Sequence, residues 1–223
     1  MDFCVLMKQE FYDKSYFEGR NSNYSPEYTK GPYLPYWKEL LDVLLEFKKS
    51  GKLLEVGCAF GYFCHVASKH FDCTGMDVSE YAINQAKKRY PNLKFFIGDI
   101  SKLSLKQKFD IITSFDSSEH VQKFDESLVN IKNLLKDDGI FIMQVPFRTP
   151  IYKIFGFLDK DPTHISIFTE EELLKKLKRH FKIIKTMYSS IYLYAINKRL
   201  YNLKFPNRLK PLSTNILIVA KKK

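Results

Sequence analysis

Residues 52–63 read Lys-Leu-Leu-Glu-Val-Gly-Cys-Ala-Phe-Gly-Tyr-Phe, and this stretch decides the fold. A short apolar run ends at Gly57, Gly61 follows, and apolar residues at helical spacing come next. The pattern predicts a strand, a tight turn and a helix. Glycine is needed where the backbone takes a positive φ or lies against a ligand, and the new helix offers unpaired N–H groups there. An ordinary turn without a ligand fits the same residues.

Acidic residues follow three of the strands predicted after the first. Asp77 ends the second strand, about 20 residues after Gly57, where dinucleotide-binding folds place the acid that holds a ribose. Asp99 follows the third strand and Asp116 the fourth. Because parallel strands end at one edge of a sheet, we expect the three carboxylates on the same edge. The strands are predicted at 53–56, 73–78, 93–97, 109–115 and 139–146.

Strands alternate with helical patterns along the chain, which favours an α/β fold with a parallel sheet and helices on both faces. One helix is predicted over 33–48, ended by Gly51, and another over 124–135. In such open sheets, ligands bind at the carboxyl ends of the strands. The glycine turn and the three acids therefore predict one binding site.

These residues resemble those of the class I S-adenosylmethionine-dependent methyltransferases, in the small-molecule branch of ubiquinone and menaquinone methyltransferases. The match covers residues 38–187 and 214–221. The family loop is typically Glu/Asp-x-Gly-x-Gly-x-Gly, and here Ala59 replaces the middle glycine, which is tolerable where its φ is negative. The segments Phe-Asp-Ser-Ser-Glu-His-Val (115–121) and Asp-Pro-Thr-His-Ile (161–165) are similar to two further segments of that branch.

The resemblance implies an α/β fold: a doubly wound, mostly parallel, seven-stranded Rossmann-like sheet. A C-terminal antiparallel strand pair, at 181–187 and 214–220, would close this sheet. We expect a single methyltransferase domain over 1–223. Its parts would be an N-terminal cap segment (1–50), a cofactor-binding core (51–187), a basic and aromatic insertion (188–213) and a last strand (214–223).

The resemblance further implies S-adenosylmethionine as cofactor and S-adenosylhomocysteine as product. Asp77 would hold the ribose hydroxyls, and Asp99 with Ile100 would flank the adenine. Glu55 would sit beneath the loop near the methionine amino group, and Asp116 would border the methionine end. The full set of expected cofactor-binding residues is Glu55, Gly57, Cys58, Ala59, Gly61, Tyr62, Phe63, Asp77, Val78, Asp99, Ile100, Phe115 and Asp116.

A sulfonium methyl is already activated, so a methyltransferase mainly aligns donor and acceptor and excludes water. A base helps when the acceptor is a hydroxyl or an acidic carbon, and His120 and His164 are the catalytic candidates because histidine titrates near neutral pH. The alternative for His164 is a loop histidine bonded to backbone. The cysteines lack metal-ligand spacing, and no metal site is predicted. We expect methyl transfer to an O or C atom of a small molecule.

A nicotinamide-dinucleotide enzyme is the main rival on the same fold. Its fingerprint is Gly-x-Gly-x-x-Gly, whereas this loop has only Gly57 and Gly61. A dehydrogenase also needs a positioned proton donor, for which the sequence offers no convincing candidate. The methyltransferase is therefore favoured.

The positive charge gathers at the end of the chain. The formal net charge is +11, and residues 173–223 hold fourteen Lys and Arg with no acidic residue. Within them, 188–213 mixes aromatic and basic residues, and a helix over 191–204 would be apolar over much of its surface with a basic end. Such a segment suits an anionic membrane surface or a nucleic acid, so a membrane-associated lipid or quinone methyltransferase and a nucleic-acid methyltransferase or binder stay open. A lid with solvated lysines is the favoured interpretation.

Aromatic residues crowd the segment before the first strand. Tyr16, Phe17, Tyr24 and Tyr28 each suit structural packing, but as a group we expect at least one to line the site. The start lacks the pattern of a secretory signal, and no apolar run reaches the ~18 residues of a membrane span. Four cysteines without secretory context favour reduced thiols and a cytoplasmic protein. The oligomeric state is left open.

Overall fold

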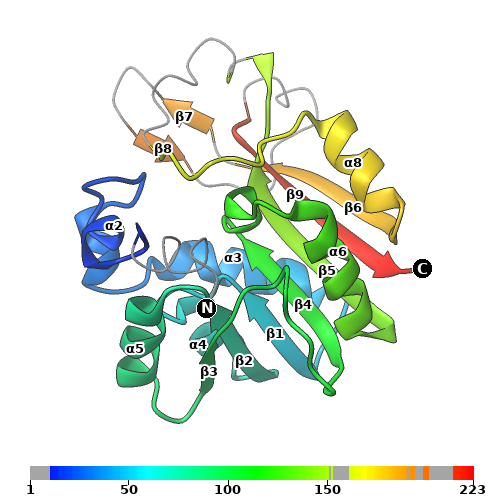
Figure 1. Cartoon of the computed structure of the whole chain (residues 1–223), viewed down its shortest axis with the longest axis horizontal. Coiled ribbons are helices and arrows are strands. Elements are labelled where there is room, and N and C mark those ends of the chain that lie inside the picture. The colour runs from blue at the N-terminus through cyan, green and yellow to red at the C-terminus, as the bar shows by residue number, and fades with distance from the viewer. Residues whose placement is uncertain (1–10, 151, 153–160, 190, 194–197, 201–212) are drawn as a thin grey trace.

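A seven-stranded sheet runs through the middle of the molecule in the order β3-β2-β1-β4-β5-β9-β6 (Figure 1). The pairs from β3 to β5 are parallel, whereas β9 lies antiparallel between β5 and β6. This is the mostly parallel sheet with an antiparallel closing pair that the sequence predicts. The computed structural model describes residues 11–150, 152, 161–189, 191–193, 198–200 and 213–223. The strands are β1 (Lys52–Val56), β2 (Asp72–Asp77), β3 (Lys94–Ile97), β4 (Phe109–Phe115), β5 (Leu135–Pro146), β6 (Phe181–Ser189) and β9 (Asn215–Lys222).

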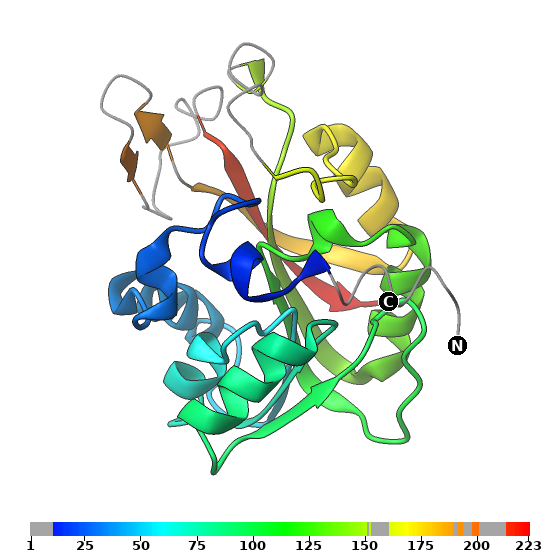
Figure 2. The same ribbon diagram turned by 60° about the vertical axis from the view of Figure 1, so that its left-hand side comes forward.

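Helices cover both faces of the sheet, and the alternation of side chains along each strand supplies both with apolar residues. Leu53 and Leu54 are neighbours on β1 and fully buried, and each belongs to a different core cluster. Leu53 faces α3 (Leu34–Leu45), α4 (Tyr62–Ala67) and α5 (Glu80–Arg89), and Leu54 faces α6 (Phe124–Leu134) and α8 (Glu170–Lys178). Figures 1 and 2 show α6 and α8 together on one side.

Local signals fix where two of these helices begin. At α5 the hydroxyl of Ser79 accepts the N–H of Ala82 at 3.0 Å, so it satisfies one of the unpaired donors of the first turn. At α8, Thr169 and Glu172 form a reciprocal capping box. Glutamates in the first turn of α8 and lysines in its last turn also complement the helix dipole.

The strand order reverses between β1 and β4, since β2 and β3 lie on one side of β1 and β4 lies on the other. The connections there leave the sheet in opposite directions and open a crevice at the carboxyl ends of the strands. Two short elements lie at this edge, the helix α2 (Lys14–Phe17) and the 3₁₀ turn η2 (Ser118–His120). The fold therefore positions a site where the sequence predicts one.

Two details differ from the sequence-based expectations. The predicted strand 139–146 begins earlier, at Leu135, because a register shift in the β4–β5 pair lets Leu135 pair with Phe109. Ile191–Leu193 (β7) and Lys198–Leu200 (β8) form an antiparallel strand pair, so the helix considered for 191–204 is wrong there. The rest of the predicted insertion, at 190, 194–197 and 201–212, lies outside the described residues. No helix in the described segments is long and apolar enough to cross a membrane.

Candidate functional site

A cavity of about 90 Å³ lies at the carboxyl ends of β1, β2 and β4. Seven of the thirteen expected cofactor-binding residues line it, together with the expected catalytic residue His120. The structure therefore brings together residues from four separate loops. The seven are Gly57, Ala59, Asp77, Val78, Asp99, Ile100 and Asp116.

The glycine turn approaches the cavity with its bare backbone. Gly57 has φ +75, and its N–H donates to the carbonyl of Met76 on the neighbouring strand at 2.8 Å. A Cβ on Gly57 would meet the Cβ of Ser117 at 2.3 Å, so both the conformation and the space require glycine. Gly61 also has a positive φ, +76, and begins α4.

Ala59 departs from the expectation of a negative φ, because its φ is +43. This left-handed conformation strains an L-residue with a Cβ. The N–H of Ala59 donates to Oδ2 of Asp77 at 2.8 Å, which ties the strained turn to the end of β2. A strained backbone next to a cavity is a common feature of functional sites.

Asp77, at the end of β2, is bonded to the glycine turn. Its Oδ1 accepts the N–H of Ser79 at 2.9 Å, while Oδ2 accepts that of Ala59. Burial raises the pKa of the Asp77 carboxyl, and these two N–H donors oppose that rise. The carboxylate is thus held in place by backbone and still borders the cavity.

Asp116, at the end of β4, is fixed from three sides. The hydroxyl of Tyr36 donates to its Oδ2 at 2.7 Å, and the amide of Asn215 donates to its Oδ1 at 2.7 Å. The amide of Gln144 donates to the Tyr36 hydroxyl at 2.6 Å. Asp116 itself has φ +47. A helix and two strands thus fix the carboxylate that the sequence places at the methionine end.

Six of the expected cofactor-binding residues do not line the cavity. Glu55 is one, because its carboxylate lies under α4 and accepts the N–H of Cys64 at 3.0 Å. Desolvation by burial raises the pKa of Glu55 to about 8. The other five are buried in or around the turn and do not reach the cavity surface. They are Cys58, Gly61, Tyr62, Phe63 and Phe115.

Four aromatic side chains from before β1 form the outer wall of the cavity. Three of the four residues expected as a group are there, Tyr16, Phe17 and Tyr24, whereas Tyr28 packs behind them. The fourth lining residue is Tyr12, which the sequence analysis missed, and its ring lies 6.0 Å from that of His120. The cavity, at about 90 Å³, is smaller than the roughly 300–1,000 Å³ typical of ligand pockets.

His120 and His164 lie side by side although they are far apart in the sequence, with ring centroids 4.8 Å apart. Backbone bonds bring them together, because the N–H groups of Ile165 and Ser166 donate to the carbonyl of Glu119 at 3.1 and 2.8 Å. His120 lines the cavity, and His164 lies behind it. Burial lowers the pKa of His120 to about 4, helped by the neighbouring imidazole.

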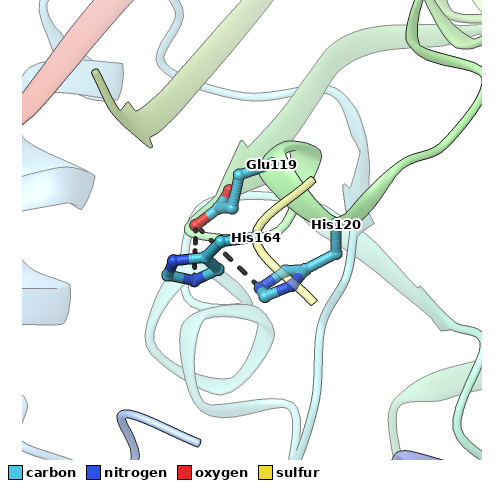
Figure 3. Close-up of side chains that lie close together, drawn as sticks. All are labelled: Glu119, His120 and His164. Carbon is cyan, nitrogen blue, oxygen red and sulfur yellow. Dashed lines mark ion pairs between the residues drawn. The ribbon is translucent and has the colours of Figure 1, made fainter. Parts of the chain in front are cut away.

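Glu119 completes this cluster and was not predicted from the sequence. Figure 3 shows its carboxylate facing both imidazole rings, with Oε1 4.0 Å from each Nε2. Glu119 is 2% exposed. The three ligand atoms lie within 4.8 Å of one another, close enough to hold a metal ion, although the sequence analysis predicts none. The adjacent Glu-His pair was the available signal, because both histidines of the cluster were already candidates and Glu119 precedes one of them.

Residues 31–181 match the model of a family described as a methyltransferase domain. The chain belongs to this methyltransferase family. The match spans more than half of the chain, and it confirms the resemblance to class I S-adenosylmethionine-dependent methyltransferases.

Curated relatives of this methyltransferase include two O-methyltransferases. The malonyl-[acyl-carrier protein] O-methyltransferase of Bacillus cereus is 28% identical over 152 residues, which cover 66% of the chain and 53% of the relative. The ubiquinone biosynthesis O-methyltransferase of Coxiella burnetii is 32% identical over 117 residues, 48% of the chain and 50% of the relative. The chain spans about half the length of the curated relatives it matches.

Solved structures share the fold of the methyltransferase. An S-adenosylmethionine-dependent methyltransferase from Clostridium acetobutylicum superposes with a TM-score of 0.65 at 16% identity, covering 98% of this chain and 99% of that one. A Pyrococcus horikoshii protein gives a TM-score of 0.65 at 22% identity, covering 86% and 91%. At these identities the likeness shows the fold alone.

Proposed function

We propose that the protein transfers a methyl group from S-adenosylmethionine to an O or C atom of a small-molecule acceptor. One observation carries this proposal: the glycine turn, Asp77 and Asp99 meet at one cavity on the carboxyl edge of the sheet, beside His120. A Cβ at position 57 would clash with Ser117 beside the cavity, and the half-buried carboxylates of Asp77 and Asp99 border the same cavity, where they would bind ribose and adenine. These residues fit a nucleoside cofactor.

The cofactor, when bound, supplies a methyl group already activated on a sulfonium. The chain's own residues then bind, orient and exclude water. Asp77, held by backbone N–H groups, would bind the ribose hydroxyls, and Asp116, held by Asn215, would border the methionine end. Tyr16 and Phe17 cover the cavity, so α2 must shift when a ligand of cofactor size enters.

The acceptor side lies at His120. A hydroxyl acceptor must lose a proton, and His120 with His164 beside it are the groups placed to govern that proton. The two curated relatives are named as O-methyltransferases, which supports an oxygen as the acceptor atom. Aromatic residues at the wall favour a small, largely apolar acceptor.

We propose that residues 1–223 form one methyltransferase domain and that the protein is cytoplasmic. Cys58, Cys64 and Cys73 are buried free thiols, which supports a reducing environment.

Calorimetry with S-adenosylmethionine, S-adenosylhomocysteine and NADH tests the proposal. We expect the first two to bind and NADH to give no heat. Asp77→Ala should weaken S-adenosylmethionine binding at least tenfold, since hydrogen bonds to a charged group contribute ~1.5–3 kcal/mol. Asp77→Asn keeps an oxygen that accepts the Ala59 N–H, but because it lacks the charge it should also bind S-adenosylmethionine weakly. Asp72→Ala, an exposed acid on the same strand, is the control.

Two outcomes would contradict the proposal at different levels. A folded Asp77→Ala protein that binds S-adenosylmethionine normally would overturn the ribose assignment. Wild-type protein that binds neither methyl donor nor product would overturn the function itself. Once binding is shown, an acceptor screen with labelled methyl donor identifies the acceptor.

A further inference from the structure

A cluster of metal-ligating side chains lies next to the cofactor cavity. Oε1 of Glu119 faces Nε2 of both His120 and His164, and the cluster is largely closed to solvent (Figure 3). Two imidazole nitrogens and one carboxylate oxygen are a donor set that divalent transition metals take in proteins. The proposed function gives Glu119 no role.

The spacing of the three groups suits an ion better than direct contact. Each Nε2 lies 4.0 Å from Oε1 of Glu119, beyond the roughly 2.7–3.2 Å of an N–H···O hydrogen bond. Around a tetrahedral ion with bonds of about 2.0–2.2 Å, neighbouring ligand atoms stand roughly 3.4 Å apart. The three ligand atoms lie within 4.8 Å of one another, so each pair must close by roughly 0.6–1.4 Å to reach the ligand spacing around one ion.

The hydrogen bonds of His120 turn the correct nitrogen toward this position. Nδ1 of His120 lies 2.8 Å from Oγ1 and 3.2 Å from the carbonyl oxygen of Thr163. The single hydroxyl proton of Thr163 goes to the carboxylate of Asp161, so Oγ1 and the carbonyl both accept from Nδ1–H. This tautomer leaves the lone pair of Nε2 free to ligate. Metal-ligating histidines usually have such an outer partner on the other nitrogen.

The outer partners are themselves fixed. Asp161 is buried, and its Oδ2 accepts the hydroxyl of Tyr16 at 2.7 Å, while Oδ1 accepts the N–H of Thr163 at 2.9 Å. Nε2 of His164 also lies 4.0 Å from Oδ2 of Asp161. A second carboxylate thus stands just outside the three ligands and adds to the negative charge that favours a cation. The cluster therefore has three ligating side chains and, around them, hydrogen-bond partners that hold the ligands in place, as metal sites do.

We propose that Glu119, His120 and His164 bind a divalent metal ion, for which Zn²⁺ is the best match. This ion holds the oxygen of the methyl acceptor. This deepens the proposed function and rests on it, because the ion acts only on an acceptor that enters beside His120. The two histidines are then ligands rather than bases. The acceptor class is a phenol or another hydroxyl compound.

The reaction balances without a further reactant. The ion lowers the pKa of the acceptor hydroxyl, whose proton leaves to solvent. The oxygen forms a bond to the methyl carbon as the carbon–sulfur bond breaks, and the sulfur keeps the electron pair. The sulfonium becomes a neutral thioether. The methylated oxygen then dissociates from the ion, which stays bound to the protein unchanged.

Metal binding by the full chain tests this directly. Protein dialysed against EDTA is titrated with Zn²⁺ by calorimetry, and Co²⁺ is added separately as a visible-absorption probe. We expect one Zn²⁺ per chain and ligand-field bands of Co²⁺ bound by nitrogen and oxygen. Both signals should fall at least tenfold in Glu119→Gln and in His164→Ala. His70→Ala, at an exposed histidine, should leave them unchanged.

A variant at Thr163, which contacts His120 but does not ligate the ion, distinguishes a loss of metal binding from a loss of folding. Thr163→Val removes the hydroxyl that orients His120, and it should weaken Zn²⁺ binding by roughly 10–100-fold. Thr163→Ser should restore it. Wild-type protein that binds Zn²⁺ no more tightly than His164→Ala would overturn the proposal, as would methyl transfer that survives EDTA at full rate. S-adenosylmethionine binding in the dialysed protein is measured in parallel, so a failure of this inference is distinguished from a failure of the proposed function.

Discussion

Ala59 holds a left-handed backbone conformation, φ +43, in the turn between β1 and α4. A Cβ in that region costs roughly 1–2 kcal/mol, and glycine removes the cost. We therefore expect Ala59→Gly to raise the free energy of unfolding by ~1 kcal/mol, measured by urea denaturation. Ala86→Gly, the same exchange inside α5, should lower it by a similar amount or more. A destabilised Ala59→Gly protein would show that the alanine methyl group contributes more by packing than its conformation costs.

Glu55 makes stability depend on pH. Its pKa is raised by burial from near 4.5 to about 8, so between these values the folded state keeps a proton that the unfolded chain gives up. Its contribution is fully present below about pH 4.5 and is lost as pH rises toward 8, with a slope of up to ~1.4 kcal/mol per pH unit. Glu55→Gln has no proton to lose and keeps an oxygen for the Cys64 N–H.

The variant should therefore be more stable than wild type at pH 8, with a difference that shrinks toward pH 5. Urea unfolding at several pH values measures both slopes. Glu80→Gln, at an exposed acid in α5, should run parallel to wild type. Parallel curves for Glu55→Gln would mean that Glu55 stays ionised in the folded state.

At the level of elements, α2 acts as the cover of the cavity. It is only four residues long, so its position depends on contacts rather than on helix stability. Its hydroxyl link from Tyr16 to Asp161 joins residues 145 positions apart. We expect Tyr16→Phe to speed the release of S-adenosylhomocysteine roughly fivefold, since one hydrogen bond contributes ~1 kcal/mol. Stopped-flow fluorescence measures the rate.

Tyr81→Phe is the matched control, because its ring packs in the same aromatic cluster. An unchanged release rate in Tyr16→Phe would mean that the aromatic packing alone holds α2. Unfolding curves of both variants show whether any change is confined to the cover.

The sequence predicts the elements best where periodicity is strong. The strand 109–115 was predicted with its observed bounds, and the helix 124–135 to within one residue. Sequence periodicity does not predict a strand boundary that depends on strand pairing. The start of β5 at Leu135, for example, depends on a register shift against Phe109. The φ of Ala59 also follows from its bond to Asp77, which sequence distance conceals.

At the scale of the whole molecule, sequence predicts the positions of those site residues that directly follow strands of the sheet. Parallel strands end together, so Gly57, Asp77 and Asp99 could be placed at one edge from their positions after strands. Tyr12 could not, because it lies in a segment before β1 whose course the strands do not fix. Glu119 follows β4 next to His120, but only the approach of His164 in the fold makes it part of a cluster. The part of the cavity at the strand ends was therefore more predictable than the part formed by the loops.

The last strand, β9, is an internal strand of the sheet, because it lies between β5 and β6 rather than at an edge. Leu217 and Ile218 are buried in opposite core clusters, so each face of the sheet depends on β9. Leu217→Ala and Ile218→Ala should each lower the free energy of unfolding by about 2–5 kcal/mol in one cooperative transition. Lys221→Ala, exposed on the same strand, should change it by less than about 0.5 kcal/mol.

Because Asn215 on the same strand holds Asp116, both core variants should also weaken S-adenosylmethionine binding. Calorimetry and urea denaturation on the same samples compare the two losses. A separate early transition with intact cofactor binding would show that β9 and β6 unfold as a unit of their own. A shared transition would show that the antiparallel end of the sheet and the cofactor site depend on one core.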